Sequence, residues 1–264
     1  MKKIILSIIL VFVLVSSAFA QIFLEEGKIN INAEPGNTVS GSITVHNTSD
    51  KPLDIKVYWQ DFNYVSPYDG NKEFLAKGLG LASAADWVSF SPESFKLPPL
   101  SNQKISYSVK VPAAIHEGHY GVLFFENRPQ AAVIEGKGVN IVTRVGSLFF
   151  IEPTDKDKKA VISDVAVSGS AIKAKIANKG NVILVAHAIY YVMTNDGMVS
   201  DRGELENIYL PPGKNTDVTI PLKASSGIQT LVLTLDLQEG DSVVKEITFS
   251  KDASGNYQIT KISD

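Results

Sequence analysis

The stretch "GSITVHNTSDKPLDIKVYWQDF" (41–62) places apolar residues at every second position on both sides of a polar turn. After the turn, Ile55, Val57 and Trp59 alternate in phase with polar residues. Alternation of this kind predicts a half-buried strand, and β-branched and aromatic residues favour the same structure. The stretch therefore predicts two strands joined by a turn.

The same pattern continues along the chain. Further alternating runs are "KISYSVKVP" (104–112), "HYGVLFFE" (119–126) and "VNIVTRVGSLFFIEP" (139–153), and Gly, Pro, Asn and Asp separate them. Short strands at this spacing, with almost no helical period, are typical of an antiparallel sandwich. The sequence therefore predicts an all-β protein.

The second half of the sequence repeats the plan of the first half. The segment 39–59 has a counterpart at 167–192, and "KLPPLSNQKISYSVKVP" (96–112) has one in "YLPPGKNTDVTIPLKA" (209–224). In each pair an Asn ends one strand, a polar turn follows, and a Leu-Pro-Pro corner precedes a later strand. Proline fixes φ and lacks an N–H, so it belongs before the strand rather than inside it. The repeat predicts two tandem immunoglobulin-like antiparallel β-sandwiches.

Residues 1–20 have the plan of a cleaved secretory signal: two lysines, an apolar run, and "AFA" before Gln21. The apolar run is shorter than the ~20 residues that a membrane-spanning helix needs, and no second run of that length follows. We therefore expect an exported protein of the periplasm or cell envelope, without a membrane span. Its domains are expected at 21–153 and 160–264, joined by the charged linker "TDKDKK" (154–159).

Composition excludes several classes of function. The chain has no cysteine, so disulfides and thiolate metal sites are excluded. Its formal net charge is −3 and basic clusters are absent, which argues against nucleic acid as a partner. No G-x-S-x-G elbow and no phosphate-binding glycine loop occur, and the strand pattern accounts for nearly every apolar residue. We expect a protein that is not an enzyme and needs no cofactor.

Two short stretches resemble metal sites but are better explained as turns. "HEGHY" (116–120) lies between two strands after a proline, where a surface turn is expected rather than a metal site. "DGNKE" (69–73) has oxygen ligands at alternate positions, but it lacks the full calcium loop of an EF-hand, and Asp-Gly-Asn is ordinary turn chemistry. It belongs to the least regular part of the first domain, the excursion 61–86, and binding residues often lie in such loops.

The first domain resembles the N-terminal domain of the PapD-type periplasmic chaperones of pilus assembly. Asn47 ends a strand twelve residues before Trp59, and "SPESFKLPP" with "QKISYSVKVP" resembles the Pro-rich corner and next strand of that family. "GHYGVLFFENRP" is similar to the strand before the long loop of those chaperones, and "VNIVTRVGSLFFIEP" to the last strand of their first domain. "IANKG" and "YLPPGKNTDVTI" occupy the matching places in the second domain, so the resemblance covers nearly the whole mature chain.

The resemblance implies a mechanism. Those chaperones use the last strand of domain one to fill a groove in an incomplete pilus subunit, and a basic pair in the cleft grips the subunit's C-terminal carboxylate. Strand addition of this kind derives affinity from main-chain bonds and selectivity from alternate side chains. Arg144 and Lys28 are the candidates for the basic pair. Alternation places Val139, Ile141, Val145, Phe149 and Ile151 on one face of the strand, and Val142, Leu148 and Phe150 on the other.

Three interpretations follow from these patterns. The first is a chaperone-like exported protein that binds another exported polypeptide, such as a pilus or surface subunit, by β-strand addition. The second is a cell-envelope module that binds wall polymer or a surface protein through the 61–86 excursion. The third is that Phe149 and its neighbours only complete the sandwich to which they belong, in which case charged substitutions there would unfold domain one.

Overall fold

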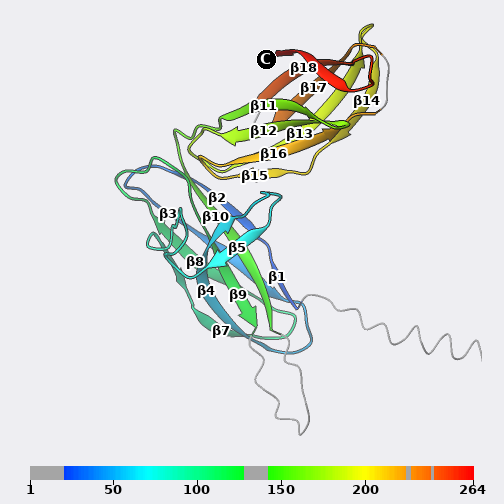
Figure 1. Cartoon of the computed structure of the whole chain (residues 1–264). Helices are drawn as coiled ribbons and strands as arrows, with labels where there is room; N and C mark the ends of the chain where they lie inside the picture. Colours follow the sequence, from blue (N-terminus) through cyan, green and yellow to red (C-terminus); the bar gives the residue numbers. More distant parts are fainter. Residues whose placement is uncertain (1–20, 128–141, 224–226, 239–240) are drawn as a thin grey trace, which may run out of the picture.

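The computed structural model describes residues 21–127, 142–223, 227–238 and 241–264. The expected signal peptide (1–20), Val139 and Ile141 lie outside these residues. The described residues form nineteen strands in two sandwiches, one above the other in Figure 1. Among the described residues, no helix is long and apolar enough to cross a membrane. The prediction of an all-β chain with two immunoglobulin-like sandwiches is confirmed.

The first sandwich packs a four-stranded sheet, in the order β1-β3-β8-β6, against a sheet in the order β2-β10-β9-β4-β5, with β7 also paired to β4. Its strands are β1 (Ile22–Leu24), β2 (Lys28–Ala33), β3 (Thr38–Asn47), β4 (Leu53–Tyr64), β5 (Lys72–Leu75), β6 (Val88–Ser91), β7 (Ser94–Leu97), β8 (Asn102–Lys110), β9 (His119–Asn127) and β10 (Thr143–Pro153). The predicted alternation around Trp59 is confirmed, because Ile55, Val57 and Trp59 all lie in the core between the sheets.

The second sandwich packs a three-stranded sheet, β11-β12-β16, against a sheet in the order β14-β13-β17-β18-β19, with β15 also paired to β13. Its strands are β11 (Ala160–Ser168), β12 (Ala171–Asn178), β13 (Leu184–Thr194), β14 (Val199–Glu204), β15 (Ile208–Leu210), β16 (Asn215–Pro221), β17 (Gln229–Asp236), β18 (Ser242–Lys251) and β19 (Tyr257–Ser263). A separate apolar core fills this sandwich.

The repeated Asn and Leu-Pro-Pro corner have the same role in both sandwiches. Asn47 Nδ2 donates to Lys51 O at 2.7 Å and to Leu97 O at 3.2 Å. Asn178 Nδ2 donates to Val182 O at 2.8 Å and to Leu210 O at 2.7 Å. Each amide therefore ties the turn after its strand to the corner before a later strand, from a site at most 2% exposed. The repeat in the sequence is a repeat in structure.

We expect Asn47→Ala to lower the free energy of unfolding of domain one by at least about 2 kcal/mol, because it leaves buried carbonyls without a donor. Trp59 and the only other tryptophan, Trp87, lie in domain one, so their fluorescence in a urea titration reports on that domain alone. Exposed Asn102→Ala is the matched control. Equal urea midpoints for the two variants would contradict this role.

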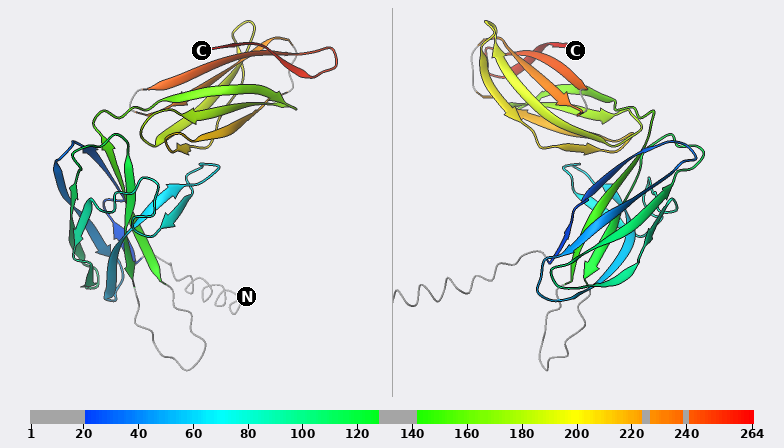
Figure 2. Two further views of the ribbon diagram at one scale, coloured as in Figure 1. Left: turned by 60° about the vertical axis from the view of Figure 1, so that its left-hand side comes forward. Right: turned by 180° about the vertical axis from the view of Figure 1, so that it is seen from behind.

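Two features of the first sandwich were not predicted. β10 pairs with β2 in parallel, with Leu148 opposite Lys28 and Pro153 opposite Ala33, whereas only antiparallel pairing was expected. The 61–86 excursion is also more regular than expected, because β4 continues to Tyr64 and β5 returns beside it. β5 projects from the sheet toward the second sandwich (Figure 2).

Candidate partner-binding strand and interdomain pocket

β10 is hydrogen-bonded on both sides in only part of its length. It pairs with β9 from Thr143 to Ile151, but its pairing with β2 begins at Leu148. The chain before β2 does not extend this pairing, because β1 belongs to the other sheet and pairs with β3. Within the described part of the chain, residues 143–147 therefore have a sheet partner on one side only. Ser147, at the end of this segment, is buried, and its Oγ donates to Glu26 O at 2.5 Å.

The direction of the backbone groups at this open edge follows from one hydrogen bond. Leu148 N donates to Gly27 O at 3.0 Å, so the backbone groups of Leu148 point away from β9. Groups on an antiparallel strand alternate between its two neighbours. The N–H and C=O groups of Arg144 and Gly146 therefore point to the open edge, and those of Val145 point to β9.

The side chains of β10 lie on two faces, as alternation predicted. Phe149 and Ile151 are fully buried in the core of the first sandwich, and Val145 packs against that core while partly exposed. The Phe149 ring lies 5.3 Å from the Trp59 ring and 5.1 Å from the Tyr107 ring, measured between centroids. These side chains stabilise their own domain.

The opposite face of β10 contributes to a cluster between the two sandwiches. Phe150 is 5% exposed, and Leu148 packs against the same cluster. Phe62, Tyr64 and Tyr120 of domain one join it, together with Ile183 of domain two. Of the described candidates for partner contact, Val142 and Arg144 are exposed, Val142 to 53%, whereas Val145 packs against the core of domain one. Leu148, Phe149, Phe150 and Ile151 are occupied by contacts within the chain.

The two cations considered as a basic pair do not lie together. The guanidinium carbon of Arg144 lies 4.4 Å from the Phe124 ring centroid, and its Nη1 donates to Gln60 Oε1 at 3.4 Å. Lys28 is opposite Leu148, four residues farther along β10, which is ~13 Å at ~3.3 Å per residue. Lys28 Nζ lies 4.2 Å from the Phe150 ring centroid instead.

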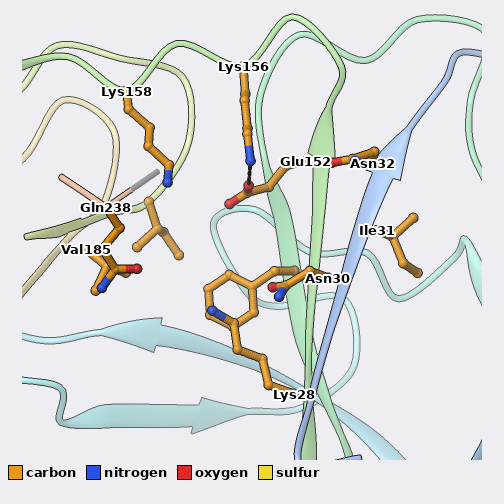
Figure 3. Close-up of a pocket in the computed structure, with 11 residues that line it drawn as sticks. Lys28, Asn30, Ile31, Asn32, Glu152, Lys156, Lys158, Val185 and Gln238 are labelled. Atoms are coloured by element: carbon orange, nitrogen blue, oxygen red, sulfur yellow. Dashed lines mark ion pairs between the residues drawn. The ribbon is translucent and has the colours of Figure 1, made fainter. Parts of the chain in front are cut away.

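Lys28 has other basic neighbours, in a pocket of about 330 Å³ between the two sandwiches. Lys156 and Lys158 also line it, and Lys156 Nζ lies 3.5 Å from Glu152 Oε2 (Figure 3). Among the described residues, these three lysines and Glu152 are the charged groups that line the pocket. A lysine ammonium group can form a charge-assisted hydrogen bond with an anion such as a carboxylate. Sequence reasoning missed this combination, because "TDKDKK" was interpreted only as a linker; its lysines were the available signal.

The remaining candidates are structural. Residues 116–118 form a connection as expected, but His119 begins β9, and its Nδ1 lies 3.0 Å from Ser83 O. Asp69 Oδ1 accepts from Asn71 N at 3.1 Å, which is a turn contact. Among the described residues, no group of three or more metal-ligating side chains occurs.

This geometry, two immunoglobulin-like sandwiches with an open strand edge and a pocket between them, can be compared with known proteins. No protein family matches the sequence, and no curated protein matches it. A chain of a chaperone–tip adhesin complex of CFA/I fimbriae biogenesis superposes with a TM-score of 0.55 at 17% identity, over 85% of this chain and 97% of that one. The class 5 fimbriae chaperone CfaA superposes with a TM-score of 0.55 at 17% identity, over 84% and 97%. The chain therefore has the fold of the PapD-type chaperones, as the resemblance implied.

Proposed function

We propose that this protein is an exported chaperone-like binding protein for a pilus or surface subunit, without catalytic activity. It binds the subunit by pairing main chain to main chain along the open edge of β10. The observation that supports this proposal most strongly is the sheet pairing, in which residues 143–147 pair with β9 on one side and with no described strand on the other, although β1 packs near this edge. An unpaired edge is a template for an additional strand, and proteins usually protect such edges.

The fold adds independent support. Two solved structures of fimbrial chaperone systems share the arrangement of both sandwiches. No observation favours the alternative of wall binding through residues 61–86, because the tip of that excursion contacts the second sandwich instead.

The first test is purification of the tagged mature protein from its native envelope after mild crosslinking, followed by mass spectrometry. The proposal predicts one dominant exported protein, whose sequence forms an incomplete immunoglobulin-like sandwich. Recovery of wall polymer, or of proteins with complete folds, would contradict it.

The pocket leads to a second expectation, that it holds the C-terminal carboxylate of the bound subunit. Lys28→Gln removes a cation that lines it and leaves the linker lysines unchanged. Charge-assisted hydrogen bonds contribute about 1.5–3 kcal/mol, so we expect binding of the purified partner to weaken by roughly 10- to 150-fold. Amidating the partner's C-terminus should have the same effect on the wild-type protein and little effect on the variant.

Lys173→Gln is the control for this experiment, because Lys173 is an exposed lysine on β12, away from the pocket. Equal affinity of the wild-type protein for partners with a free and with an amidated C-terminus would show that the pocket does not bind the partner's C-terminal carboxylate.

A further inference from the structure

The described residues of the two sandwiches meet in one cluster, to which Tyr64 and Tyr120 of domain one and Ile183 and Tyr209 of domain two belong. Hydrogen bonds join the sandwiches at two places along this cluster, in addition to the covalent linker. The first is the turn between β12 and β13. Asn181 O accepts from Gly118 N at 2.9 Å, and Asn181 Nδ2 donates to His116 O at 2.9 Å. The same asparagine binds the linker, because its Oδ1 accepts from Asp157 N at 2.7 Å. Close by, Ile183 N donates to Tyr120 Oη at 2.8 Å, so all of these contacts lie at the end of the interface beside the linker.

The second place is the tip of the β4–β5 hairpin, residues 65–71. This hairpin lies at the edge of the sheet opposite β2, and its tip contacts domain two. Tyr209 N donates to Tyr68 O at 2.8 Å, and Thr216 Oγ1 donates to Pro67 O at 3.0 Å. Both acceptors are main-chain carbonyls of the hairpin tip. The side chain of Tyr68 adds to this contact, because it packs against the core of the second sandwich and against the cluster between the sandwiches.

Aromatic packing strengthens the second contact. The Tyr64 and Tyr209 rings stack with centroids 5.0 Å apart and an interplanar angle of 20°. Lys72 Nζ lies 4.7 Å from the Tyr64 centroid and donates to Gly70 O at 3.1 Å. Gly70 has a φ of +106°, and a Cβ there would lie 3.0 Å from the Tyr209 ring. The tip is thus shaped to fit against this tyrosine.

We propose that the β4–β5 hairpin is a clasp that fixes the angle between the two sandwiches. One contact beside a linker leaves a hinge, whereas a second contact at a distance from it removes the remaining rotation. The clasp also holds Ile183 and Val185 of domain two against the pocket that contains Lys28. The clasp is a property of the free protein, so it does not depend on the identity of any partner.

The absence of cysteine allows a direct test by pulsed electron spin resonance on spin labels. Labels at Lys110→Cys in domain one and Lys173→Cys in domain two, both exposed positions, report the distance between the sandwiches. The otherwise unchanged chain should give one narrow distance distribution. Tyr64→Ala combined with Tyr209→Ala should widen that distribution at least about twofold. Tyr191→Ala, an exposed tyrosine on β13, should leave the distribution narrow.

A second variant removes the hairpin tip, including Tyr68, but leaves the stacked pair Tyr64 and Tyr209 in place. Replacing residues 66–70 by Asn-Gly closes the hairpin with a two-residue turn, which is compatible with the β4–β5 ladder, and deletes both carbonyl acceptors. It should also widen the distribution. An unchanged narrow distribution in either clasp variant, with both domains shown to be folded by circular dichroism, would overturn the proposal.

Discussion

Arg144→Pro is expected to weaken capture of the partner by roughly 5- to 150-fold, whereas Arg144→Ala has a much smaller effect. The N–H of Arg144 points to the open edge, and proline removes it. A carbonyl of the added strand is then left without a donor, which costs about 1–3 kcal/mol. Because this N–H does not bind β9, proline is tolerated there as it is on other edge strands.

The matched control is Val145→Pro, one residue along the strand. The N–H of Val145 points to β9, so this change breaks a bond inside domain one and should lower the stability of the free protein. Affinities would be measured by isothermal titration with the purified partner. Equal affinities for Arg144→Pro and Arg144→Ala would show that the main chain of this edge does not bind the partner.

Phe149→Ala is expected to lower the free energy of unfolding of domain one by about 3–5 kcal/mol. Phe149 is fully buried between Trp59 and Tyr107, so the change removes two aromatic contacts and leaves a cavity. Tryptophan fluorescence in urea measures the loss. Val142→Ala, at an exposed position on the same segment, should change stability by less than about 0.5 kcal/mol.

This experiment distinguishes two possible roles of Phe149 in β10, which are packing in the core of domain one and contact with the partner. If Phe149→Ala left stability unchanged and reduced capture alone, Phe149 would be a partner contact, and the assignment of the second half of β10 to its own core would be wrong.

The fold could be predicted from local patterns because both halves of the sequence contain the same order of strands, turns and proline corners. Asn47 and Asn178 each end a strand before a turn, and each Leu-Pro-Pro corner marks the place that the asparagine binds. Alternation also placed Phe149 and Phe150 on opposite faces of β10 correctly. These patterns involve residues that are close together in the sequence, so they can be recognised without knowledge of the three-dimensional arrangement.

The site could be predicted only in part, because its properties depend on which strands are neighbours. Nothing in the sequence around Leu148 shows that β2 pairs with it in parallel. Nor does the sequence show that this pairing stops there, so that Arg144 and Gly146 have no described sheet partner on the side away from β9. Lys156 and Lys158 line the pocket because the linker runs from β10 to β11 beside it, which the sequence does not show. The hairpin tip appeared to be an irregular loop, since its partner, Tyr209, lies far away in the sequence.

Amide hydrogen exchange of residues 143–147, free and bound to the purified partner, tests the central claim most directly. In the free protein, the amides of Val145 and Ser147 should already be protected by β9, while those of Arg144 and Gly146 exchange rapidly. Binding should protect Arg144 and Gly146 and change the other two little. Rapid exchange at Arg144 and Gly146 in the saturated complex would contradict strand addition at this edge.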